Sequence, residues 1–196
     1  MTAYAFEGLR PVIDGTAYVH PTAVLIGDVV VGPRCYVGPG ASLRGDFGRL
    51  VLGDGSNLQD NCVMHSFPGR EVGLEHCAHV GHGAVIHGCL IGRNALVGMN
   101  AVVMDNVMVG EDSFIGAMSF VKAGTVIPPR TLWAGVPARQ LRDLTESELA
   151  WKLRGTEEYQ ALAARCLIGL IACDPLTAEE TDRPRLAGDY RPLSER

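Results

Sequence analysis

Large aliphatic side chains recur at every sixth position along most of this chain. The longest series runs without a slip from Ile91 to Trp133, and a small or compact residue stands four positions after each large one. An α-helix repeats every 3.6 residues and a strand with one buried face every two, so neither accounts for a period of six. Short strands that form the walls of a coil, stacked on the coil before, do account for it. The pattern predicts an all-β body built as a β-helix.

Breaks in the period show where the chain should leave this scaffold. Residues 1–139 are expected to form the β-helix, with an entry segment at its start. The step between Leu43 and Leu52 is nine residues, and the step between Met64 and Val80 is sixteen, which predicts a loop over residues 66–78. Loops on a stiff scaffold are common places for binding groups.

The pattern becomes helical after residue 139. Thr145 and Glu148 have the spacing of a capping box ahead of an apolar-periodic run. Gly155 is expected to end that run and Thr156 to start another, which predicts two helices within residues 140–173 that lie along the β-helix. Residues 174–196 combine prolines with many charges, so we expect an extended tail that is ordered only when a partner chain holds it.

Composition narrows the possible partners and the compartment. The formal net charge is −5 without a basic run, which argues against a nucleic-acid or anionic-membrane surface. The start of the chain has no signal-peptide pattern and no apolar run is long enough to span a bilayer, so we expect a cytoplasmic protein. The six cysteines show no paired spacing and are expected to be reduced: Cys35, Cys62, Cys77, Cys89, Cys166 and Cys173.

Histidines concentrate after the predicted loop, and their register favours a shared site. His65 and His87 each follow an inward aliphatic residue and should point outward, while His82 belongs to a neighbouring wall and should diverge from them. Convergence of the three then requires a second subunit, and a threefold ring is the natural closed arrangement of triangular prisms. Three imidazoles with an open position are typical of a catalytic metal centre. The alternative is that these are ordinary solvated or hydrogen-bonded histidines at turns.

Two polar clusters accompany these histidines, each with two interpretations. Arg44 and Asp46 either form an ion pair that orients a subunit contact or contribute directly to catalysis. Gln59 and Asp60 are either hydrogen-bonded corner residues or helpers of a metal centre. As helpers, Gln59 would orient a metal-bound water and Asp60 would fix a ligand or an arginine.

Arg44-Gly45-Asp46, Asn57-Leu58-Gln59-Asp60, His65, and His82 with His87 together resemble the pattern of the gamma-class carbonic anhydrase family. The resemblance implies a left-handed parallel β-helix, a homotrimer and a metal ion held between subunits. By the same resemblance the ligands are His65, His82 and His87 and the ion is zinc, with iron or cobalt as alternatives. The family carries a glutamate just after the Arg-Gly-Asp segment, whereas this chain has Phe47, and only Glu71 or Glu75 could replace a second family glutamate in the loop.

Further stretches, among them Gln59 to His65 and Leu96 to Asp105, resemble the branches of this family linked to phenylacetic acid degradation and to the carnitine operon. We therefore expect a metal-dependent hydrolase that uses metal-bound hydroxide at a trimer interface, most simply an acyl-CoA thioesterase of aromatic acid catabolism. One alternative is carbon dioxide hydration. Two others are a hexapeptide acyltransferase with a single histidine as general base, and a noncatalytic accessory protein of carnitine-CoA metabolism.

Overall fold

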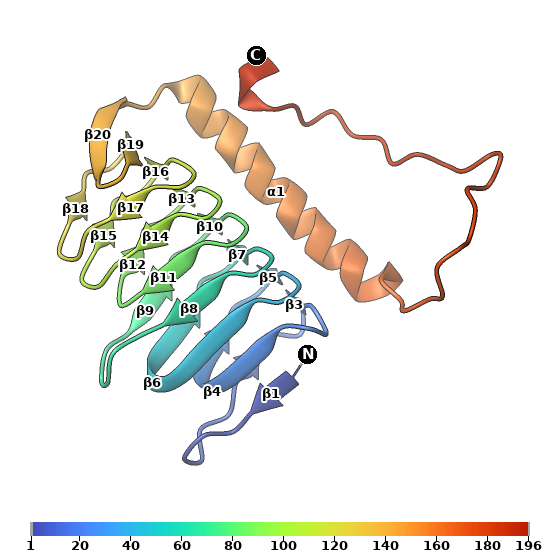
Figure 1. Ribbon diagram of the computed structural model, residues 1–196, viewed down its shortest axis with the longest axis horizontal. Coiled ribbons are helices and arrows are strands. Elements are labelled where there is room, and N and C mark those ends of the chain that lie inside the picture. Colours follow the sequence, from blue (N-terminus) through green and yellow to red (C-terminus); the bar gives the residue numbers. More distant parts are fainter. Residues whose placement is uncertain (1, 196) are drawn as a thin grey trace.

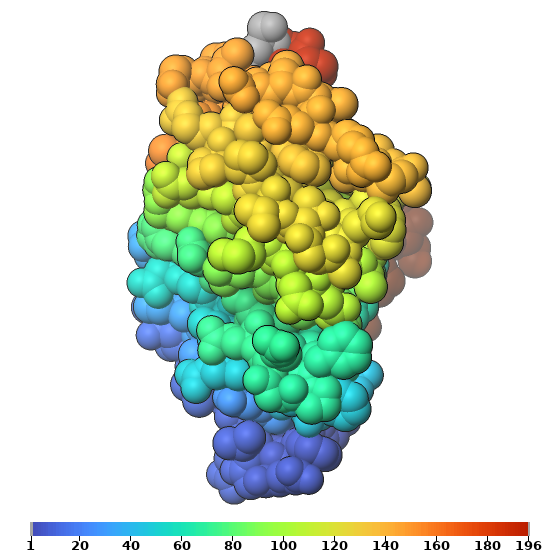
Figure 2. All heavy atoms as spheres, turned by 90° about the vertical axis from the view of Figure 1, so that its left-hand side faces the viewer, coloured from blue at the N-terminus to red at the C-terminus, as the bar shows by residue number. Residues whose placement is uncertain are grey.

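The aliphatic residue of each six-residue unit points into one column inside the molecule. Leu25, Leu43, Met64, Ile86 and Val103 have no exposed surface, and each pairs in parallel register with the next. This computed structural model describes residues 2–195 and confirms the parallel β-helix (Figure 1). Figure 2 shows the coils stacked in sequence order from the bottom of the view to the top. The interior is therefore a narrow, mostly apolar core that leaves outward positions free for other roles.

The β-helix has three walls, which we call A, B and C in the order in which each coil visits A, B and then C. Two long strands, β4 and β6, bend around a corner and so belong to both A and B. Wall A contains β1 (Thr2–Tyr4), the first part of β4 (Val24–Val31) and of β6 (Ser42–Leu52), β8 (Val63–His65), β11 (Val85–His87), β14 (Val102–Val103) and β17 (Phe120–Val121). Wall B contains β2 (Val12–Ile13), the ends of β4 and β6, β9 (Val72–Leu74), β12 (Leu90–Ile91), β15 (Met108–Val109) and β18 (Val126–Ile127). Wall C contains β3 (Tyr18–Val19), β5 (Tyr36–Val37), β7 (Asn57–Leu58), β10 (His79–Val80), β13 (Leu96–Val97), β16 (Phe114–Ile115), β19 (Thr131–Gly135) and the antiparallel β20 (Ala138–Asp143).

The predicted loop over residues 66–78 is too long. Val72 and Leu74 are buried and lie in β9, which pairs with the end of β6 and with β12. The two residues are two positions apart and point to the same side, as the inward positions of a strand do. Only the segment of about 66–71 therefore leaves the scaffold, and it emerges directly after His65.

The two predicted helices are one. The capping box at Thr145 is present, and α1 (Glu146–Gly169) continues through Gly155 without a break. A glycine inside a helix costs about 1 kcal/mol relative to alanine. Here a Cβ atom would lie 2.5 Å from the Tyr190 hydroxyl, so the glycine permits a close approach of the tail.

The helix covers wall C along its length (Figure 1). At one end Leu149 and Trp151 pack with Phe114, and at the other end Ala163 packs with Tyr18 and Tyr36 of β3 and β5. The tail beyond residue 173 contains a short 3₁₀ helix (Leu193–Glu195), and the Tyr190 ring stacks on Trp151. The chain's own helix thus contacts the tail that we expected a partner to hold. Within residues 2–195 no helix is long and apolar enough to cross a bilayer.

Lys152 joins α1 to the β-helix from a fully buried position. Its Nζ donates hydrogen bonds to the Cys77 carbonyl oxygen (2.5 Å) and to Asn94 Oδ1 (2.7 Å). Burial lowers the pKa of Lys152 from 10.5 to about 7. The folded chain therefore releases this proton at a lower pH than the unfolded chain does.

Between these two pKa values the unfolded state binds one more proton, so the free energy of unfolding should rise with pH from about 7 to about 10, by up to ~1.4 kcal/mol per pH unit. Denaturant titrations across that range would measure the slope. Lys152→Met should remove it, whereas Lys122→Met, at an exposed lysine, should keep it. An equal slope in Lys152→Met and in the unaltered protein would contradict this assignment.

Candidate functional site

Wall A carries a column of polar side chains on its outer face. Arg44, His65 and His87 are direct neighbours in the parallel register, because β6, β8 and β11 stack on one another. The residues before the two histidines, Met64 and Ile86, are fully buried, and this fixes the histidines on the outside. Nδ1 of His65 lies 3.2 Å from Nε2 of His87. The structure therefore brings two of the three predicted ligands into direct contact.

A carboxylate orients each of these two rings. Asp46 Oδ1 lies 3.2 Å from His65 Nε2, and Asp105 Oδ1 lies 2.6 Å from His87 Nδ1. The nitrogens that face each other are thus the ones that no carboxylate holds. Burial, and next to it the Arg44 charge, lowers the pKa of His65, which favours its neutral form.

Arg44 and Asp46 form the ion pair that the sequence suggested, with Nη2 3.0 Å from Oδ2. Burial raises the pKa of Asp46, but the hydrogen bond from Arg44 and the other interactions outweigh this and leave the pKa below its usual value. The carboxylate therefore stays charged at neutral pH and keeps its hold on His65.

The other predicted residues form a second cluster at the corner between walls C and A. His82 Nδ1 pairs with Asp60 Oδ2. Gln59 is buried and its Nε2 lies 2.7 Å from Nε2 of His79, so within one chain it faces that ring instead of the His65–His87 pair. No cluster of three or more potential metal ligands occurs among residues 2–195. Within one chain the predicted site residues therefore form two separate clusters, His65–His87 on wall A and Asp60–His82 at the corner.

The donor set fits a metal ion. Two nitrogens bound to one tetrahedral zinc ion at about 2.05 Å are about 3.3 Å apart, which matches the His65–His87 contact of 3.2 Å. His65, His82 and His87 each have one ring nitrogen paired with a carboxylate. This carboxylate–histidine arrangement is typical of metal ligands because it fixes the tautomer and the ring orientation.

Two aromatic rings border the histidine pair. The Phe47 ring lies 5.3 Å from that of His65, and the Phe67 ring lies 5.2 Å from that of His87. Both side chains are about half exposed, at 52% and 54%. Of the two glutamates considered as replacements for the family's second carboxylate, Glu71 shares a surface cavity with Asp46, whereas Glu75 accepts a hydrogen bond from the Arg93 backbone.

Two residues of this region were not predicted from the sequence to belong to the site. Asp105 follows His87 by eighteen positions, one more than the seventeen that separate the paired residues Ile86 and Val103, and that spacing was the available signal. His79 lies half-buried between Asn57 and Gln59, and desolvation lowers its pKa to about 3. Its place on the same outward column as Asn57 also follows from the register, but its burial depends on α1.

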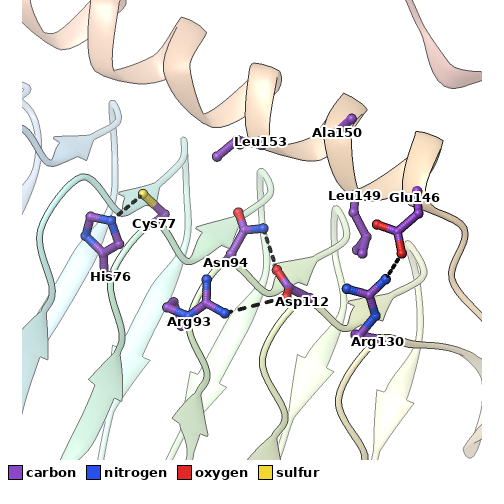
Figure 3. A pocket seen from close by; sticks show the side chains of 10 residues that line it. All are labelled: His76, Cys77, Arg93, Asn94, Asp112, Arg130, Glu146, Leu149, Ala150 and Leu153. Atoms are coloured by element: carbon purple, nitrogen blue, oxygen red, sulfur yellow. Dashed lines mark hydrogen bonds and ion pairs between the residues drawn. The ribbon is translucent and has the colours of Figure 1, made fainter.

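The remaining histidines and the cysteines lie elsewhere. His20 contacts Thr22 near the start of the chain, and His76 lies 3.2 Å from the Cys77 sulfur, under α1 (Figure 3). All six cysteines are free, as expected for reduced thiols, and Cys35 and Cys62 are fully buried at their predicted inward positions.

On the hypothesis that His65 and His87 bind zinc, Asp105→Asn should weaken that binding by about 10- to 100-fold, because it replaces the charged carboxylate that orients His87 with a neutral amide. Competition with a chromogenic chelator would measure the affinity. Asp112→Asn is the matched control, since Asp112 occupies the next corner of the same coil and bonds to Asn94. Equal zinc affinity for Asp105→Asn and the unaltered protein would show that this contact does not support a metal ligand.

Residues 88–123 match the family model described as bacterial transferase hexapeptide (six repeats), which fits the predicted left hand of the β-helix. The carnitine operon protein CaiE of Citrobacter koseri is 57% identical over 188 residues, 96% of this chain and 95% of that protein. Its counterpart from Salmonella dublin is 56% identical over 196 residues, 99% of each chain. These relatives are named for the carnitine operon, so they do not support the link to phenylacetic acid degradation.

Two solved structures share the fold over most of the chain. A Bacillus cereus protein assigned as an acetyltransferase superposes with a TM-score of 0.83 at 33% identity, over 85% of this chain and 96% of that one. A hexapeptide transferase family protein from Anaplasma phagocytophilum superposes with a TM-score of 0.80 at 35% identity, over 83% and 96%.

Proposed function

The chain belongs to the hexapeptide-repeat family that includes the carnitine operon protein CaiE, and from that premise we propose that it is a metal-dependent enzyme that hydrolyses acyl-CoA thioesters. The reaction centre is the His65–His87 pair of one subunit, completed by the partner subunit's His82 in a homotrimer. The observation that carries the proposal is the pair of facing ring nitrogens, 3.2 Å apart, with a carboxylate on the far side of each ring.

A divalent ion bound to these histidines would supply Lewis-acid chemistry and a water whose pKa falls to about 7. Zinc is the ion that we propose, because three imidazoles with an open position suit it. Asp46 and Asp105 hold His65 and His87 in one orientation. Arg44 places a positive charge beside the centre, where it stabilises the negative charge that develops on the carbonyl oxygen of the substrate.

The residues around the pair favour an acyl substrate over carbon dioxide. Phe47 occupies a place where the resembling family has a proton-transferring glutamate, and its ring packs on His65. A phenyl ring accepts no proton, but together with Phe67 it provides apolar surface for an organic substrate and limits water near the centre. We therefore propose thioester hydrolysis as the main activity.

Acyl transfer is the second candidate. The likeness to a protein assigned as an acetyltransferase favours it, as does the 2.6 Å contact that makes His87 and Asp105 a possible base and its orienting partner. In that reaction His87 would take a proton from the hydroxyl or amine of an acceptor, and His65 would not be essential.

Purified protein should hold about one zinc ion per chain and release CoA thiol from acyl-CoA, and a chelator should abolish turnover. His65→Ala and His87→Ala should each lose the metal and reduce turnover at least about 100-fold, whereas His20→Ala, at a remote histidine, should retain both.

Chelator-resistant hydrolysis would contradict the proposed centre. Acyl transfer to an added acceptor that survives His65→Ala but not His87→Ala would establish the second candidate instead.

A further inference from the structure

A cavity of about 650 Å³ lies between α1 and wall C. We call it the helix–wall pocket. Its floor is the outward column of wall C, where His79, Leu96, Phe114 and Leu132 stack in register. Trp151 and other residues of α1 form the opposite side. The volume is in the range of pockets that bind small molecules.

The wall side of the helix–wall pocket is polar at one end. His79, Gln59 and His82 all belong to its lining and lie on two adjacent coils. The rest of the wall C column, from Leu96 to Leu132, is apolar. A ligand that fits this arrangement has one polar end and an extended apolar part, because an unpaired polar group at the apolar end would be costly.

The tail encloses the helix–wall pocket from the outside. Tyr190 lines it and stacks on Trp151 with ring centroids 5.8 Å apart, while Trp151 Nε1 donates a hydrogen bond of 2.9 Å to the Arg191 carbonyl oxygen. Gly155 leaves the space into which the Tyr190 hydroxyl fits. The enclosure thus depends on a segment nearly forty residues away in the sequence.

We propose that the helix–wall pocket binds the apolar acyl group of an acyl-CoA thioester, with the thioester at the His82 end. The proposal rests on the proposed function, because His82 belongs both to the pocket and to the proposed reaction centre. The charged nucleotide of CoA stays outside, since the lining residues that the structure describes include no lysine or arginine. The acyl group is a medium-length alkyl or aryl chain that reaches along Leu96 and Phe114.

Binding of a CoA thioether tests this without turnover, because a thioether has no carbonyl to attack. Octyl-CoA thioether should bind the full-length protein at least about tenfold tighter than CoA does, since each buried methylene adds affinity. Isothermal titration calorimetry would measure both constants. Ala117→Trp should place an indole in the pocket and remove the preference for the octyl group, while leaving CoA binding unchanged.

Ala123→Trp is the matched control. Ala117 and Ala123 are both exposed, and each precedes a corner residue with positive φ, but Ala123 does not line the pocket. Size-exclusion chromatography of both variants checks that assembly is retained. No preference for octyl-CoA, or a preference that survives Ala117→Trp, would overturn the proposal.

Tryptophan fluorescence gives a second readout that needs no variant within the pocket. The chain has two tryptophans, of which Trp151 lines the pocket and Trp133 does not. An 8-bromooctyl-CoA thioether should quench the emission of the Trp133→Phe variant, because bromine quenches on contact, and absence of quenching would overturn the proposal.

The two proposals can be refuted independently of each other. Octyl preference with quenching, but without hydrolysis of any acyl-CoA, would refute only the proposed function. Hydrolysis of acetyl-CoA without octyl preference would refute only the pocket.

Discussion

The in-register stacking of successive coils is the constraint on which the candidate site depends. Backbone hydrogen bonds between parallel strands hold residues of neighbouring coils above one another, and the apolar column inside leaves each strand one orientation. Arg44, His65 and His87 therefore meet although more than forty residues of chain separate the first from the last. Side chains on paired strands are also better fixed than side chains on loops.

Carboxylates fix the orientation of the histidine rings at this site. Asp46, Asp60 and Asp105 each contact one histidine, and all three lie at or near a corner. A prism has room at its corners for such groups, because the outward-facing corner side chains are not part of the core. The same geometry separates His82 from the other two histidines, so the proposed centre makes assembly of subunits part of the chemistry.

Sequence reasoning could predict the features that repeat or that depend on near neighbours. The six-residue period fixed the inward column, and Thr145 and Glu148 located the start of α1. The outward placement of His65 and His87 followed from the same register.

Features that depend on distant contacts could not be predicted in this way. The local sequence predicts that the helix ends at Gly155, and only the close approach of Tyr190 explains a glycine within a continuous helix. The burial of His79 depends on α1, and Tyr159 of that helix contacts its ring. The contact between Asp105 and His87 could be predicted only by counting about one coil along the chain. A single aspartate at a turn carries no signal until the coil length is known.

Complementation between inactive variants tests most directly whether two subunits share one centre. His65→Ala and His82→Ala chains, carrying different tags, would be coexpressed and mixed trimers assayed for acyl-CoA hydrolysis. Each variant alone should be inactive, and random mixing in equal amounts should restore about one quarter of the activity, because one contact in four joins two intact clusters. Mixed trimers as inactive as the parent variants would contradict the account.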